Sequence, residues 1–183
     1  MNIEEFEKNI GISFKNKELL LNALTHTSYA YEHRTDSNEK LEFLGDAILE
    51  FVISEYLYKN YKDLKEGEMT KVRAAVVCEE SLYKVAKLHE FGRFLKIGKS
   101  EVTSNGNQKP AILADAVEAV IAAIFLDSGI EKVKEFILNN LKAEVEVASK
   151  NVGMKDYKTV LQEKLQEHGE VKIVYEVIKE ERS

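Results

Sequence analysis

The sequence predicts an all-α domain followed by the start of an α+β module. Apolar residues recur with a helical period through most of the chain, and Pro110 is the only proline among 183 residues. Apolar and polar residues alternate convincingly only in Val171–Glu181, which predicts a strand. Because a single strand needs pairing partners, we expect the second module to be incomplete.

Seven helices are expected before residue 149, from periodicity and from signals at their ends. They cover about Ile3–Ile10, Lys17–Thr25, Glu39–Tyr61, Glu66–Val77, Glu79–Leu88, Ile112–Asp127 and Ile130–Ala148. Residues 28–37, 62–68 and 98–111 are polar and rich in turn-forming residues, so they are expected to be loops, with a turn at Asn105-Gly106.

The expected domain boundary lies near Ala148. Residues 1–148 form the first domain and residues 149–154, which are polar and include a glycine, form a linker. Residues 155–183 then supply a helix that ends at Gly169, where glycine suits a C-terminal cap, and the predicted strand.

Composition indicates a cytoplasmic globular protein. The hydrophobic content of 44% is enough for a core, and no segment approaches the roughly 18 apolar residues of a membrane span. The acidic N-terminus does not resemble a secretory signal. Cys78 is the only cysteine and therefore cannot form an internal disulfide, so we expect it to serve in packing.

The net charge of −6, from 32 acidic and 26 basic side chains, argues against a nucleic-acid binder held mainly by lysine and arginine. An acidic protein can still bind a polyanion through metal ions, whose charge reverses the local sign.

Four acids form a stripe on the helix predicted over Glu39–Tyr61. At 100° per residue one narrow sector contains Glu39, Glu42, Asp46 and Glu50. A solvated face would explain such a stripe, but two neighbours do not fit it. Gly45 lies within the apolar face, where it suggests close approach of another helix, and Phe43 lies beside the acids, where a large ring needs a cover.

The helix predicted over Ile112–Asp127 is apolar nearly all round, which predicts burial. Asp115 and Glu118 are its only acids before the C-terminal end, and their i,i+3 spacing puts them on one face. Burying two unpaired carboxylates costs several kcal/mol, so a compensating group is required.

If the two acidic faces meet, oxygen ligands converge as Mg²⁺ or Mn²⁺ requires. Buried partners such as Lys71 or Arg73, or protonated acids, are the alternative. A di-iron centre is disfavoured because the sequence lacks the Glu-x-x-His pairs of such sites. Carboxylate-bound divalent ions are typical of phosphoryl transfer, where they activate water and neutralise charge.

The segment Asn38–Glu50, "NEKLEFLGDAILE", resembles the signature of the ribonuclease III family of double-stranded-RNA endonucleases. Three further segments agree in order: "THTSYAYEH", "EGEMTKVRAAVV" and "ILADAVEAVIAAIFLDSG". The resemblance spans about residues 1–150. The segment "DYKTVLQEKLQEHG", with the strand after it, resembles the start of a double-stranded-RNA-binding domain.

The resemblance implies a role for each matching acid. Glu42, Asp115 and Glu118 would hold the divalent ion. Asp46 and Glu118 would be most essential for hydrolysis, with Asp46 orienting metal-bound water. Glu39 and Glu66 would support the site or handle substrate, while Glu50 has no active-site role in the family.

The resemblance also implies a homodimer in which each of two centres cuts one strand of an RNA duplex. The products would have 5′-phosphate and 3′-hydroxyl ends with a short 3′ overhang. Phe43 would insert into the partner subunit. The usual substrates would be ribosomal RNA precursors and some mRNAs and tRNAs.

In the C-terminal segment, Thr159 and Gln162 match positions that touch the RNA minor groove. Gln162 as an ordinary surface residue is the alternative. The family's basic helix start would lie past Ser183, so we expect weak, salt-dependent binding to duplex RNA.

Two rival functions remain. A catalytically silent duplex-RNA-binding scaffold would be expected to lack one of the six acids, and all are present. A compact relative that acts on ribosomal RNA without a binding domain is disfavoured by the segment that begins at Asp156.

Overall fold

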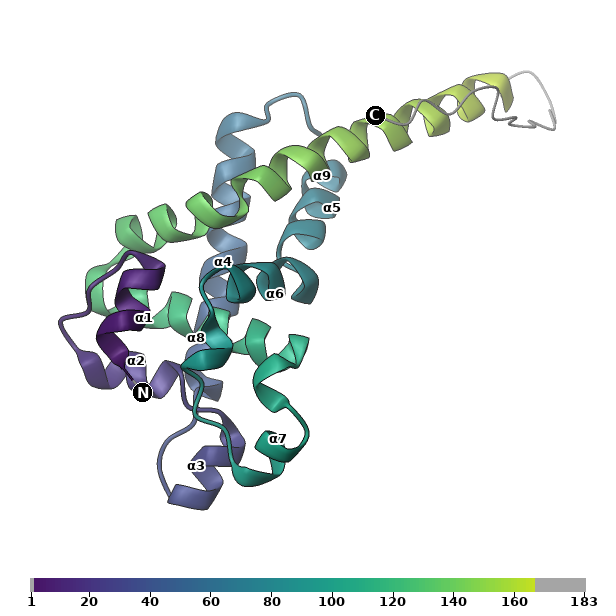
Figure 1. Cartoon of the computed structure of the whole chain (residues 1–183). Coiled ribbons are helices and arrows are strands. Elements are labelled where there is room, and N and C mark those ends of the chain that lie inside the picture. Colours follow the sequence, from purple (N-terminus) through teal and green to yellow (C-terminus); the bar gives the residue numbers. More distant parts are fainter. Residues whose placement is uncertain (1, 167–183) are drawn as a thin grey trace.

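The computed structural model describes the backbone of residues 2–166, and this part of the chain is helical (Figure 1). Its elements are α1 (Ile3–Ile10), α2 (Lys17–Ala23), α3 (Thr27–His33), α4 (Glu39–Asn60), α5 (Glu66–Val76), α6 (Glu79–Leu88), η1 (Phe91–Arg93), α7 (Lys99–Thr103), η2 (Gly106–Gln108), α8 (Pro110–Ser128) and α9 (Ile130–Gln166). Extended pairing within residues 2–166 is limited to one bridge between Thr25 and Lys96. The all-α prediction is confirmed for this part, whereas the strand predicted in Val171–Glu181 lies outside it.

Helix α8 forms the centre of the core, as its apolar sequence predicts. Most of its side chains are buried, and it packs against α2, α4, α6 and α9. A Cβ atom added to Gly45 of α4 would lie 1.8 Å from the carbonyl oxygen of Glu118, so the two helices touch backbone to backbone. The close helix approach predicted at Gly45 is confirmed.

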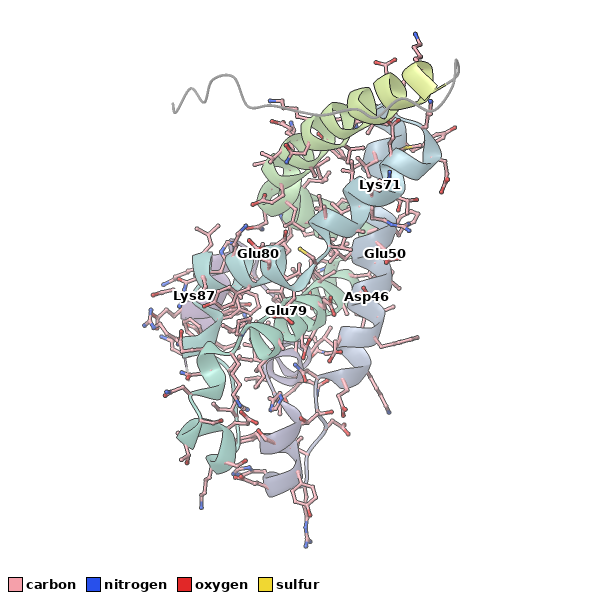
Figure 2. The ribbon with its side chains drawn as sticks, turned by 90° about the vertical axis from the view of Figure 1, so that its right-hand side faces the viewer. Asp46, Glu50, Lys71, Glu79, Glu80 and Lys87 are labelled. Carbon is pink, nitrogen blue, oxygen red and sulfur yellow. The ribbon has the colours of Figure 1, made fainter. Side chains whose placement is uncertain are left out.

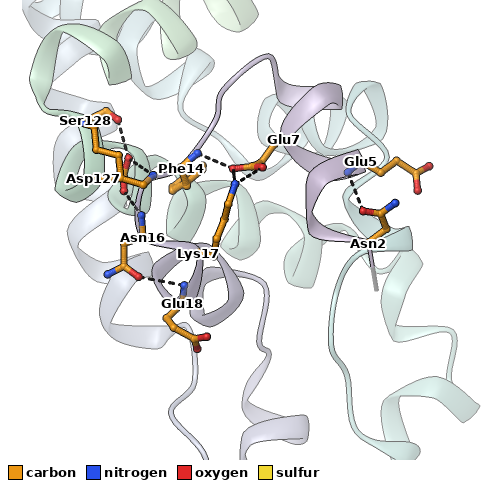
Figure 3. A network of polar contacts seen from close by, with 10 residues as sticks. Asn2, Glu5, Glu7, Phe14, Asn16, Lys17, Glu18, Asp127 and Ser128 are labelled. Carbon is orange, nitrogen blue, oxygen red and sulfur yellow. Dashed lines mark hydrogen bonds and ion pairs between the residues drawn. The ribbon is translucent and has the colours of Figure 1, made fainter.

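The N-terminal residues are fixed to the end of α8 by polar contacts (Figure 3). The Asp127 carboxylate accepts hydrogen bonds from the backbone N–H groups of Lys15 (3.2 Å) and Asn16 (2.8 Å). Glu7, which is buried, accepts from the Phe14 N–H at 2.6 Å and pairs with Lys17. We call these contacts of residues 7–17 with each other and with Asp127 the N-terminal anchor.

Two segments that were predicted as loops contain short helices. Residues 28–37 include most of α3, whose first turn is capped by the His26 ring accepting from the Ser28 N–H. Residues 98–111 include α7, followed by the predicted turn, where Asn105 has a φ of 53°. Both helices are too short to show a helical period in a polar sequence, which is why the prediction missed them.

Helix α9 continues to Gln166 instead of ending at Ala148. Residues 149–154, predicted as a linker, are therefore helical, and the division into two domains stays a prediction. No proline interrupts this stretch, Val152 still packs on the core, and Gly153 costs only about 1 kcal/mol in a helix. Figure 1 shows the last turns of α9 projecting away from the other helices. None of the helices in residues 2–166 has both the length and the hydropathy that a membrane crossing requires.

Candidate metal centre

Three carboxylates meet where α4 crosses α8. One oxygen atom from each of Glu42, Asp115 and Glu118 lies within 4.8 Å of the other two. Glu42 lies on the first turn of α4, while the i,i+3 spacing of the other two directs both from α8 toward it. Since Gly45 lets the helix backbones touch, these side chains converge on one point. We call them the carboxylate cluster.

Burial and mutual repulsion disfavour the ionised form of the carboxylate cluster. Burial raises the pKa of Glu118 to about 8, and the charges of Asp46, Asp115 and Glu42 act in the same direction. Burial likewise raises the pKa of Glu42, with repulsion from Asp115, Glu39 and Asp46. At neutral pH the cluster therefore favours binding either a proton or a cation.

The ion pairs found among the described residues include no member of the carboxylate cluster. Arg73, considered above as a buried partner, instead donates from Nη1 to Ser54 Oγ at 2.9 Å. Lys71 lines a groove with Cys78 between α5, α6 and α9. The alternative of buried lysine or arginine partners therefore does not describe this site.

The remaining predicted acids differ in their electrostatic effect on the carboxylate cluster. Asp46 is exposed on α4 (Figure 2), and its charge raises the pKa of both Glu42 and Glu118. Glu39 acts on Glu42 alone and accepts a hydrogen bond from Ser37 Oγ at 2.8 Å. Glu66 accepts from Thr70 Oγ1 at 3.1 Å, and its charge is not among those that shift the cluster.

Phe43 and Cys78 are not members of the carboxylate cluster. The Phe43 side chain is 81% exposed on α4, although it is a large apolar ring. Cys78, expected to serve in packing, is half-buried at the start of α6, and its Sγ lies 3.3 Å from the Ala75 carbonyl oxygen. Thr159 and Gln162 fall on the last turns of α9, where the side chains lie outside the described part of the structure.

Two titratable residues that influence Asp115, His26 and Glu79, were missed by sequence reasoning. Burial raises the pKa of Asp115, a charge on His26 opposes this rise, and Glu79 adds to it. Glu79 begins α6 and lies on the face turned toward the viewer in Figure 2, together with Asp46. His26 precedes α3, in a segment that had been assigned no site role. Both residues are distant from Asp115 in sequence, so no local pattern could reveal them.

Comparison with known proteins places this chain in a family. Residues 16–145 match the Ribonuclease-III-like family. The chain is 50% identical to Ribonuclease 3 of Clostridium perfringens, over 99% of this chain and 77% of that protein, and 49% identical to Ribonuclease 3 of Oceanobacillus iheyensis, over 98% and 80%.

Solved structures agree with the sequence comparison. The nuclease domain of ribonuclease III from Campylobacter jejuni superimposes with a TM-score of 0.74 at 41% identity, covering 78% of this chain and 98% of that domain. A second structure of the same nuclease domain gives a TM-score of 0.72 at 42% identity. The chain therefore belongs to the ribonuclease III family of endoribonucleases.

Proposed function

We propose that this chain is a Mg²⁺-dependent endonuclease that hydrolyses double-stranded RNA. The observation that carries the proposal is the carboxylate cluster: three acids on facing helices, close together and without a cationic partner in the described part of the chain. Family membership supports the same reaction. Oxygen-only ligands of this kind suit Mg²⁺, and Mn²⁺ would be expected to substitute.

The proposed role of each acid follows from its position. Glu42, Asp115 and Glu118 would hold the divalent ion. When bound, such an ion supplies a Lewis acid for the phosphate and lowers the pKa of water. The exposed Asp46 carboxylate lies beside the cluster and is suited to accept a hydrogen bond from the attacking water and orient it. Glu39 and Glu66 would support the site or contact substrate.

The proposed products have 5′-phosphate and 3′-hydroxyl ends with short 3′ overhangs, made by two centres in a homodimer. One of the two Campylobacter jejuni structures shows flexibility in a region of that nuclease domain involved in dimer formation. The exposed Phe43 ring is the proposed dimer contact here. Thr159 and Gln162 are the proposed contacts to duplex RNA. Cytoplasmic ribosomal RNA precursors and some mRNAs and tRNAs are the proposed substrates.

Cleavage of a labelled RNA duplex at low salt tests this function. We expect cutting with Mg²⁺ and none after EDTA is added. Asp46→Asn and Glu118→Gln should each lower the rate by about a thousandfold or more, since loss of transition-state charge stabilisation has effects of that order. Glu50→Gln, an exposed acid on the same helix, is the matched control and should cut normally. Cutting that persists in EDTA would refute the metal dependence. No cutting with either metal would refute the proposed activity and leave the silent RNA-binding scaffold.

The dimer contact has its own test. Phe43→Ala should weaken the dimer, because it removes an apolar ring that is exposed in the single chain and that the partner subunit would cover. Sedimentation over a range of concentrations measures the effect. Tyr31→Ala, which removes a side chain 90% exposed on α3, is the control. Equal dissociation constants for the two variants would exclude Phe43 from the interface.

A further inference from the structure

His26 lies at a junction of three chain segments. Its backbone N–H donates to the carbonyl of Lys96 at 3.0 Å, just before α7. The carbonyl of the preceding residue, Thr25, accepts from the N–H of Asn38 at 2.9 Å, and the Asn38 carbonyl in turn accepts from the N–H of Glu42 at 2.9 Å. Thr25 and Asn38 are both buried. The position of His26 is thereby tied to the first turn of the helix that carries Glu42.

Hydrogen bonds define the orientation and tautomer of the His26 ring. Its Nδ1 accepts from the Ser28 N–H at 3.3 Å. Ser28 Oγ accepts from the Gly98 N–H at 2.8 Å, so its own proton points to Nδ1, also at 2.8 Å. With Nδ1 acting as an acceptor, the proton of the neutral ring lies on Nε2.

The Nε2–H group of His26 is available to a ligand. Its only hydrogen-bond contact in the described structure is a long one, 3.4 Å to Thr27 Oγ1, and the residue is partly exposed. Of the side chains whose charges shift the pKa values of Glu42, Asp115 and Glu118 in residues 2–166, His26 is the only basic one. The backbone hydrogen bonds through Asn38 bring this donor close to the first turn of α4, which carries Glu42.

We propose that His26 contacts the substrate, donating its Nε2–H to a phosphate oxygen of RNA bound at the metal centre. This inference rests on the proposed function, because it requires a polyanion at the carboxylate cluster. Phosphate oxygens are the usual acceptors for such donors at protein–nucleic acid interfaces. An imidazole is suited to this position because Nε2–H is a donor both in this tautomer of the neutral ring and in the protonated ring.

The variant His26→Asn separates substrate contact from the structural role of the ring. Asparagine is a favourable helix N-cap, and its Oδ1 can replace Nδ1 as the acceptor for the Ser28 N–H, but it has no group at the position of Nε2. His26→Gln extends an N–H donor toward the Nε2 position. His33→Asn is the matched control, because His33 lies at the other end of α3, stacked on Tyr29 with ring centroids 3.8 Å apart.

The experiment measures kcat and KM for duplex cleavage, together with the unfolding temperature and Mg²⁺ binding by calorimetry. For His26→Asn we expect kcat/KM to fall about tenfold or more, as for loss of one hydrogen bond to a charged group, with unchanged unfolding temperature and Mg²⁺ affinity. His26→Gln should recover most of the loss, and His33→Asn should match the wild type.

Three results would overturn the inference. The first is a kcat/KM of His26→Asn within twofold of the wild type. The second is a fall in the Mg²⁺ affinity of His26→Asn that parallels its loss of kcat/KM. The third is a lowered unfolding temperature of His26→Asn together with no recovery of kcat/KM in His26→Gln. Absence of cleavage by the wild-type chain would instead refute the proposed function itself, so the two failures are distinguishable.

Discussion

The N-terminal anchor and the carboxylate cluster both include acids of α8, under opposite conditions. In the anchor, Asp127 accepts from two backbone N–H groups and Glu7 pairs with Lys17. Slight burial of Asp127 opposes ionisation, but the hydrogen bonds from Asn16, Ser128 and Lys15 outweigh it and lower its pKa. At the cluster, burial raises the pKa of Glu118 to about 8, and residues 2–166 supply no such partner to its carboxylate.

This difference separates acids that stabilise the fold from acids that are suited to bind a ligand. A paired carboxylate lowers the free energy of the folded chain, whereas an unpaired one beside others raises it. The cluster therefore opposes folding until a proton or cation binds. Such a destabilising arrangement is typical of a functional site.

The largest effect on stability is expected from Gly45→Ala. The new Cβ would overlap the Glu118 carbonyl oxygen at 1.8 Å, and overpacking of this kind costs about 3 kcal/mol or more. Cleavage should be lost with it, since the helices that carry the cluster must separate. Chemical denaturation measures the change. Gly67→Ala is the control, since its Cβ would meet nothing within 4 Å and alanine favours a helix by about 1 kcal/mol. Similar shifts in both variants would show that Gly45 does not set the helix approach.

The next effect is the pH dependence of the metal-free chain. The folded-state pKa of Glu118, about 8, exceeds its ordinary value of 4.5, so the folded state holds its proton more tightly than the unfolded state. Stability from this group is then fully present below pH 4.5 and is lost as pH rises through 8. Unfolding temperatures measured in EDTA should fall over this range.

Two variants sharpen the pH test. Glu118→Gln should flatten the fall in stability toward alkaline pH, because the titrating group is gone. Asp127→Asn should act at the other end of the scale: the pKa of Asp127 is lowered from 3.8, so its stabilisation is present above that pH and lost on acidification. Identical pH profiles for wild type and Glu118→Gln would contradict the proposed contrast.

The smallest effect is expected from Lys17→Met, which leaves the buried Glu7 carboxylate without its ion-pair partner. The Lys17 side chain is 43% exposed, so solvent screening limits the loss to about 1 kcal/mol. Cleavage per folded molecule should stay at the wild-type level because the anchor is separate from the cluster. Urea unfolding together with the cleavage assay measures both quantities. A loss of cleavage without a loss of stability would show that the N-terminal anchor contributes to the function of the carboxylate cluster.

The sequence determined the helical class and the identity of the cluster acids. The period of apolar residues located α4, α6 and α8, and Asp115 and Glu118 stood out because they interrupt a helix that is otherwise apolar. Gly45 was informative for the same reason, since a glycine inside an apolar helix face needs a close neighbour. These are local patterns, and the spacing of residues along a helix is sufficient to predict which face carries each of them.

Helix spacing did not decide which acids meet, although the family resemblance pointed to Glu42, Asp115 and Glu118. The acidic stripe contained Glu39, Glu42, Asp46 and Glu50, yet only Glu42 joins Asp115 and Glu118, because the point of contact at Gly45 fixes how α4 crosses α8. His26 and Glu79 reach Asp115 from chain segments far from it in sequence. The pKa of Glu118 likewise depends on burial by these packed helices. Helix spacing predicts faces, but the crossing of two helices is set by long-range packing, which one-dimensional patterns do not encode.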